Sequence, residues 1–256
     1  MKTRCFGTII NKLETTDSTS LFAEKLLQTE KPCEGSVILA GFQQDGRGAG
    51  NNTWQSEAGK NLLASIILYP EFLPPGDQFE LNKVISLAVL FCVQGFLPKA
   101  NVQIKWPNDI YVDYRKIAGI LTKNSITGNK IGHTIVGVGI NVNQEAFPDD
   151  LPNPVSIRQL SGLTVDIQSV LVQLMDFLNI LYHKLEVGEL GFIDNQYLKN
   201  LLNMNRKTWY QKGNQVFEGK ITGVSRFGRL QMEINDEMHE YDFKEITLLF
   251  KNISSQ

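Results

Sequence analysis

Two short segments combine cationic, amide and carboxylate side chains within stretches that otherwise have the composition of buried strands. The first is Lys105-Trp106-Pro107-Asn108-Asp109, and Lys116 follows seven residues after its aspartate. A protein core seldom buries a lysine that has no anionic partner. Either lysine alone would be explained by a strand-end salt bridge or an exposed hairpin. Together they predict a site that holds negatively charged reactants.

A glycine-rich loop upstream is the second candidate for anion binding. Glycines occupy alternate positions in Gly46-Arg47-Gly48-Ala49-Gly50, and Trp54 follows. Glycine lets the backbone approach a ligand closely, and successive amide N–H groups can form a concave anion site. Arg47 adds a planar cationic fork suited to phosphate or carboxylate. The pattern matches neither the dinucleotide-binding motif nor the P-loop. Trp54 is expected either to anchor the core or to stack on a nucleobase.

Asparagine and aspartate side chains add further candidate ligands. Asn141 and Asn143 end a strand that contains Gly137 and Gly139. They could turn the chain, or they could bind a ribose hydroxyl or a phosphate oxygen. Asp109 could hold Mg²⁺ through one carboxylate, with waters and phosphates completing the octahedron. The three histidines are scattered, so no metal cluster or catalytic triad is indicated.

The elements that must position these residues are strands and helices in alternation. The segment Asp17-Ser18-Thr19-Ser20 predicts the N-cap of a first helix. Strictly alternating Leu230 to Ile234, among several glycine turns, predicts a small antiparallel β-barrel after residue 200. Hydrophobic periodicity predicts strands at 36–42, 62–69, 102–106, 110–112, 116–121 and 131–142, and helices at 21–27, 81–96 and 171–185.

Length and composition suit one large domain and one small one in an ordinary soluble protein. The chain has 256 residues, 42% hydrophobic and 20% charged, with a formal net charge of -2. This charge provides no general attraction to nucleic acid or membrane, so a cationic site must be local. Three widely spaced cysteines fit a reducing cytoplasm. No apolar run is expected to reach the length of a membrane span, and the start at Met1 to Arg4 is not expected to be a signal peptide.

The order and combination of these motifs resemble the biotin protein ligase family. The resemblance covers roughly residues 14–145 and, more weakly, the C-terminal part. It implies an α+β fold, with a mixed-sheet catalytic domain like that of class II aminoacyl-tRNA synthetases over residues 1–200. It also implies an SH3-like C-terminal barrel over 201–256. The motifs that carry it are Asp17-Ser18-Thr19, Gln43 to Trp54, Lys105 to Asp109, Lys116 to Leu121 and Gly137 to Asn143.

The resemblance implies a reaction in two steps. Biotin and ATP, with Mg²⁺, give biotinyl-5′-AMP and pyrophosphate, and a lysine of a biotin carboxyl carrier protein then takes the biotin. Only 16 residues precede Asp17. We therefore expect the monofunctional form without a helix-turn-helix domain, acting in the cytoplasm as a monomer or homodimer. Neither nucleic acid nor membrane is an expected partner.

Matching residues assign roles by resemblance, although no general base for the transfer step is identified. The catalytic residues would be Lys116, Arg47 and Lys105, and Asp109 would bind Mg²⁺. The residues that contact biotin or the adenylate would be Ser18, Thr19, Ser20, Gln43, Gly46, Arg47, Gly48, Lys116 and Gly119. The residues on the ATP side would be Trp54, Lys105, Asn108, Asp109 and Asn141.

The glycine loop departs from the family pattern, and three competing functions remain open at this point. Many family members carry further arginines in the loop, where this chain has Ala49, Gly50, Asn51 and Asn52. We therefore expect the loop to hold the adenylate less tightly. The competing functions are a lipoate–protein ligase, which has a similar architecture, a non-catalytic small-molecule sensor and a pure interaction module. Gln43-Gln44 and the Lys-Trp-Pro-Asn-Asp segment favour biotin.

Overall fold

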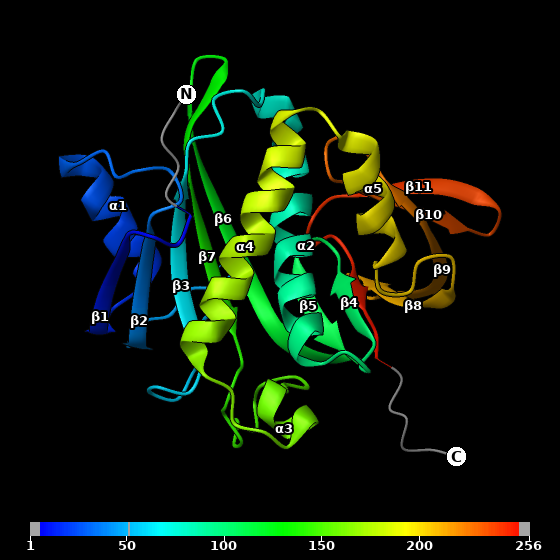
Figure 1. Cartoon of the computed structure of the whole chain (residues 1–256). Coiled ribbons are helices and arrows are strands. Elements are labelled where there is room, and N and C mark those ends of the chain that lie inside the picture. Colours follow the sequence, from blue (N-terminus) through cyan, green and yellow to red (C-terminus); the bar gives the residue numbers. More distant parts are fainter. Residues whose placement is uncertain (1–5, 51, 251–256) are drawn as a thin grey trace.

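A seven-stranded mixed sheet forms the centre of the computed structural model, which describes residues 6–50 and 52–250 (Figure 1). Its strand order is β1-β2-β3-β7-β6-β5-β4. Strand β1 runs parallel to β2, and the other neighbouring strands are antiparallel. The predicted mixed α+β architecture is therefore confirmed. The strands are β1 Ile10–Thr16, β2 Val37–Gln43, β3 Leu62–Leu68, β4 Val102–Lys105, β5 Asp109–Val112, β6 Arg115–Thr127 and β7 Lys130–Ile140.

Helices cover both faces of this sheet, because its central strands carry apolar side chains in both directions. Helix α1 (Thr19–Thr29) packs against the face that presents Ile38, Ile67 and Ile135. Helices α2 (Gln78–Phe96) and α4 (Ile167–Glu186) cover the opposite face (Figure 1). Successive side chains of a strand point to opposite faces, so a strand buried on both sides has the continuous apolar sequence of β3.

Helix α2 corrects one expectation from the sequence. The segment Pro75–Phe96 is long and apolar enough to cross a membrane, judged by length and composition. However, 72% of the apolar 18-residue stretch within this segment is buried inside the protein. There α2 packs against α4 and the sheet. The helix is apolar nearly all round because neighbours surround it, as expected for a core helix.

A second sheet follows residue 200 and is wholly antiparallel. Its order is β11-β10-β9-β8-β12. The turn at Asn235-Asp236 has both φ angles positive, 50° and 66°, as tight hairpins require. The predicted short antiparallel strands after residue 200 are therefore present. The strands are β8 Lys207–Lys212, β9 Gln215–Val224, β10 Leu230–Ile234, β11 Glu237–Tyr241 and β12 Thr247–Leu248.

The second sheet docks against the first through polar and aromatic contacts. Trp106 Nε1 donates a hydrogen bond of 3.0 Å to Gly228 O. Arg226 makes a two-pronged ion pair with Asp77, just before α2. The ring of Phe243 packs edge-on against Trp106 at 6.2 Å between centroids. These contacts place the C-terminal sheet beside the Lys105–Asp109 segment.

The predicted strands and helices are present with shifted ends, but one strand and two α-helices were not anticipated. These are β1, α3 (Ile157–Ser161) and α5 (Leu190–Lys199). Strand β1 lies at an edge of the sheet with a half-exposed pattern, so its sequence carries a weak apolar signal. It belongs to the sheet because the crossover through α1 places it alongside β2. The residues Met1 to Arg4, which were not expected to form a signal peptide, lie outside the described part.

Candidate active site

A cavity of about 350 Å³ lies where β6 and β7 face the glycine loop and the C-terminal sheet. It gathers nearly all the residues singled out from the sequence, which come from segments far apart in the chain. Gly46 and Asn141 are not part of its wall. The predicted residues that line it are Ser18, Thr19, Ser20, Gln43, Arg47, Gly48, Trp54, Lys105, Asn108, Asp109, Lys116 and Gly119.

One end of the cavity is built from uncharged hydroxyl and amide groups. Thr19 N and Oγ1 both donate to Gln43 Oε1, at 2.8 and 3.1 Å. Ser65 Oγ donates to Thr19 Oγ1 at 2.8 Å and lies 3.0 Å from Ser20 Oγ. Helix α1 begins here, so its first turn presents these hydroxyls beside the end of β2. This network orients Gln43 and gives the end of the cavity neutral hydrogen-bonding groups.

The other end of the cavity is cationic. Lys116 Nζ forms an ion pair of 2.8 Å with Asp109 Oδ2, and β4–β5 pairing places Lys105 opposite Asp109. Burial lowers the pKa of Lys105, and the nearby Lys116 lowers it further, while Asp109 opposes both effects. A desolvated lysine beside a second lysine favours an anionic ligand, because such a ligand would relieve the repulsion.

Trp54 lies over a bare patch of the sheet. A Cβ at Gly119 would lie 2.8 Å from Trp54 Cζ3, and a Cβ at Gly139 would collide with the indole ring. These two glycines are direct register partners on β6 and β7. Lys116 Nζ lies 5.9 Å from the centre of the Trp54 ring. Trp54 Nε1 is buried and has no hydrogen-bond partner in the described part of the chain. The glycines therefore create the space that the indole occupies.

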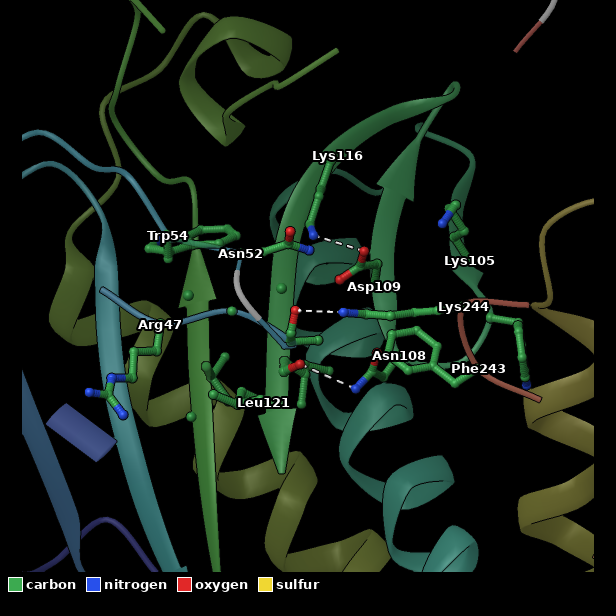
Figure 2. A pocket seen from close by; sticks show the side chains of 18 of the residues that line it. Arg47, Asn52, Trp54, Lys105, Asn108, Asp109, Lys116, Leu121, Phe243 and Lys244 are labelled. Atoms are coloured by element: carbon green, nitrogen blue, oxygen red, sulfur yellow. Dashed lines mark hydrogen bonds and ion pairs between the residues drawn. The ribbon is translucent and has the colours of Figure 1, made fainter. Parts of the chain in front are cut away.

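The glycine loop differs from its sequence-based prediction. Gly48 N donates to Asn52 O and Trp54 N to Gly46 O, both at 2.8 Å. These two amides are used inside the loop and do not face a ligand. Arg47 Nε lies 3.9 Å from Asp45 Oδ2. Figure 2 shows the Arg47 side chain directed away from the Lys116–Asp109 pair. The loop is thus closed on itself, and Asn51 lies outside the described residues.

Asn108 and Asn141 hold the backbone near the site. Asn108 Nδ2 donates to Ile120 O at 3.2 Å. Asn141 is buried, and its Nδ2 donates to Val155 O at 3.0 Å. Val155 N in turn donates to Lys116 O at 2.9 Å. Asn141 therefore supports the strand that carries Lys116, and it does not reach the cavity wall where it was expected.

The C-terminal sheet supplies part of the wall that the sequence did not indicate. Phe243 and Lys244 line the cavity, and Lys244 Nζ donates to Ala49 O at 3.2 Å (Figure 2). Ser65 was also missed, although it completes the hydroxyl network. No local motif marks these residues, because their partners lie far away in the chain. The wall contributed by this sheet and the segments flanking it is Leu202, Tyr210, Ile221, Leu230, Phe243, Lys244, Ile246, Thr247 and Leu248.

Known proteins share both the sequence pattern and the fold. Residues 13–141 match the model of the biotin/lipoate A/B protein ligase family. The chain belongs to this family. The bifunctional ligase/repressor BirA of Bacillus spizizenii is 29% identical over 253 residues, covering 97% of this chain and 76% of that protein. The biotin–[acetyl-CoA-carboxylase] ligase of Paracoccus denitrificans is 29% identical over 228 residues, covering 85% of this chain and 91% of that one.

A solved structure agrees with the family assignment at the level of fold. The biotin protein ligase of Aquifex aeolicus, in complex with biotin and ATP, superposes with a TM-score of 0.79. It is 23% identical, and the match covers 95% of this chain and 99% of that chain. The family member described here therefore has the fold of a ligase whose structure holds both reactants.

Proposed function

We infer that this family member is a biotin–protein ligase. It activates biotin with ATP to biotinyl-5′-AMP and pyrophosphate, and transfers the biotin to a lysine of a biotin carboxyl carrier protein. The observation that carries this inference is the polarity of the cavity, which is neutral at the Thr19–Gln43 end and cationic at the Lys105–Lys116 end. Biotin has the matching polarity, a neutral ureido ring at one end and a carboxylate at the other.

The neutral end favours biotin over lipoate. Gln43 Oε1 is held by Thr19, which leaves the amide nitrogen to face a ligand oxygen. The Ser65 hydroxyl donates to Thr19 Oγ1 and lies 3.0 Å from the Ser20 hydroxyl. A ureido group can satisfy such groups, whereas the dithiolane ring of lipoate offers them no good partner. Leaving a buried polar group unpaired costs about 1–3 kcal/mol, so the pocket disfavours lipoate.

The cationic end offsets the repulsion between the reactants. A carboxylate oxygen of biotin must approach the α-phosphorus of ATP, and pyrophosphate leaves. Two unit charges about 4 Å apart repel by about 4 kcal/mol at an effective dielectric constant of about 20. Lys116, with two further N–H donors besides the one facing Asp109, bridges the carboxylate and the α-phosphate. Lys105 adds a second positive charge, and Arg47 joins when the loop rearranges around the adenylate.

Asp109 fits a magnesium ion that arrives with the nucleotide. It is the only carboxylate in the described cavity wall, and no cluster of three ligating side chains occurs in the described part of the chain. Mg²⁺ is commonly held by one or two carboxylates with substrate phosphates and waters, so Asp109 alone suits it and a protein cage does not. When bound, the ion would neutralise phosphate charge.

The remaining residues position the nucleotide and exclude water. Trp54 forms an aromatic wall over Gly119 and Gly139, and Asn108 holds the neighbouring strand through Ile120 O. The glycine loop, with Gly46 and Gly48, closes over the adenylate and protects this mixed anhydride from hydrolysis. Asn141 acts by supporting the Lys116 strand. For the transfer step, an incoming lysine amine attacks the carbonyl carbon and AMP leaves.

The proposed domain division follows from the way the two sheets share the cavity. Residues 1–200 form the catalytic domain, and residues 201–256 form an SH3-like domain whose five-stranded sheet completes the cavity. The catalytic sheet resembles that of class II aminoacyl-tRNA synthetases, which also form acyl-adenylates. The protein acts in the cytoplasm, on a subunit of a biotin-dependent carboxylase.

Biotin-dependent exchange of labelled pyrophosphate into ATP tests the first step. We expect exchange with biotin and none with lipoate. Lys116→Ala should abolish exchange, whereas Lys123→Ala should retain it, because Lys123 lies on the same strand and pairs with Glu24 on the α1 side. Exchange with lipoate alone would assign the sister activity. Biotin binding without exchange would identify a sensor.

A further inference from the structure

Lys244 reaches from the C-terminal sheet into the candidate active site. It lies in the connection between β11 and β12, and its Nζ donates to Ala49 O of the glycine loop at 3.2 Å (Figure 2). A Cβ at Gly50 would collide with this Nζ. The loop is therefore shaped around the lysine, across 195 positions of sequence.

The backbone at Lys244 is in an unfavourable conformation. Its φ angle is +69°, in the left-handed region that glycine adopts freely and a long side chain rarely does. Such a position costs about 1–3 kcal/mol. Lys244 lies in a turn that Glu245 N closes by donating to Asp242 O at 3.1 Å.

Among the described residues, the cavity wall offers Lys244 no anionic partner. The described cavity wall holds four cationic side chains and one carboxylate, Asp109. The cations are Arg47, Lys105, Lys116 and Lys244. Asp109 is paired with Lys116, and in the described residues no carboxylate lies within ion-pair distance of Lys244. An ammonium group has three donors, and Ala49 O takes one. Two donors thus remain on an ammonium group that lies 5.7 Å from the centre of the Phe243 ring and lines a cavity whose net charge is positive.

We propose that Lys244 binds the β- and γ-phosphates of ATP, and then the leaving pyrophosphate, while its contact with Ala49 holds the glycine loop over them. The proposal rests on the proposed function, because that function brings ATP to this cavity. Lys116 and Lys105 lie at the reacting end, so the polyphosphate is left to a cation from the opposite wall. The C-terminal sheet then completes the nucleotide site instead of only covering it.

Direct titration of magnesium pyrophosphate, and of ATP in the absence of biotin, tests this assignment. Lys244→Met keeps the length of the side chain and removes its charge, and Lys244→Arg restores the charge. We expect the Met variant to bind both ligands about tenfold more weakly, the size of one charge-assisted hydrogen bond. The Arg variant should stay within about threefold of the wild type. Biotin binding, titrated alone, should be unchanged.

A matched control separates the charge in the cavity from general docking of the C-terminal sheet. Arg226→Met removes an ion pair between the sheets, with Asp77, and Arg226 is not part of the cavity wall. We expect this variant to bind pyrophosphate normally. Equal weakening in Arg226→Met and Lys244→Met would overturn the proposal, since docking alone would then explain both.

Three further results would decide the role of Lys244. The proposal would be overturned if Lys244→Met bound pyrophosphate as tightly as the wild type does. It would also be overturned if the wild type did not bind pyrophosphate. A loss of biotin affinity equal to the loss of pyrophosphate affinity would reduce Lys244 to a loop tie. Failure of the proposed function is distinguishable, because it would abolish biotin-dependent exchange in the wild type while leaving the dependence of pyrophosphate binding on Lys244.

Discussion

A single methyl group at Gly139 would test whether Trp54 shapes the nucleotide side of the cavity. The added Cβ would lie 2.7 Å from Trp54 Nε1 and 2.8 Å from Cζ2, whereas ordinary contact begins at 3.4 Å. Trp54 Cε2 would lie closer still, so the indole must retreat by about 1 Å. The three nearest atoms around the new methyl group all belong to Trp54, and Gly139 does not have a positive φ angle. The effect should consequently act through the indole.

The expected magnitude follows from this displacement. Overpacking of this kind costs about 1–3 kcal/mol, unless the ring can move toward the open cavity. A misplacement of about 1 Å in an active site can lower activity by about 100-fold. For Gly139→Ala we expect a roughly tenfold rise in KM for ATP, equivalent to about 1.4 kcal/mol, and a smaller change in the free energy of unfolding.

A double-mutant cycle in the pyrophosphate-exchange assay checks the cause. Trp54→Ala should raise KM for ATP at least as much as Gly139→Ala, and the double variant should be no worse than Trp54→Ala alone. Gly191→Ala, at a position with nothing within 4 Å, serves as the control and should leave KM unchanged. If Gly139→Ala costs as much without the indole as with it, the contact with Trp54 is not the cause and the reasoning fails.

Four further predictions concern Lys105, Asn141 and Tyr182. Lys105→Met should abolish exchange yet raise the free energy of unfolding at pH 7 by ~1 kcal/mol, because burial lowers the pKa of this lysine and the charged form is held at a cost. The free energy of unfolding of the wild type, measured in urea, should rise as the pH climbs from the lowered pKa of Lys105 to the ordinary 10.5. In this range the unfolded chain binds more protons than the folded one. Lys105→Met should lack this rise. Asn141→Ala should lower stability by about 1–3 kcal/mol in the same assay, because Val155 O loses its donor; an unchanged midpoint would contradict the support assigned to it. Tyr182→Phe removes a 2.7 Å hydrogen bond to buried Glu34 and should cost about 1.5–3 kcal/mol by thermal unfolding, whereas a loss below ~0.5 kcal/mol would mean that other donors suffice.

Much of the fold was predictable because burial leaves a periodic trace in the chain. The continuous apolar run of β3 and the long apolar pattern of α2 follow from cover on both sides. The Asn235-Asp236 turn was recognisable because hairpins need positive φ angles. Strand β1 was missed because an edge strand is half exposed. Its place in the sheet depends on parallel pairing with β2, a contact between residues 27 positions apart, as in Ile10 with Val37.

The chemistry of the site was predictable wherever the reacting groups are neighbours in sequence. Lys105, Asp109 and Lys116 lie on successive strands joined by short turns, so the chain itself brings them together. Arg47 shows the limit of such reasoning, because its residue type suits an anion but its side chain is directed away from the pair. Side-chain direction depends on the loop's internal hydrogen bonds, which the residue types alone do not determine.

The sequence by itself determined which functional groups are available, namely the lysines, the carboxylate and the glycine loop, because their types are set residue by residue. Only the tertiary structure decided which of them share a cavity. It paired Lys116 with Asp109, laid Trp54 over two glycines of different strands, and brought Lys244 to the loop. The physical reason is that these contacts join segments far apart in the chain. Their geometry arises from sheet register and from docking of the second sheet, which no local pattern of residues encodes.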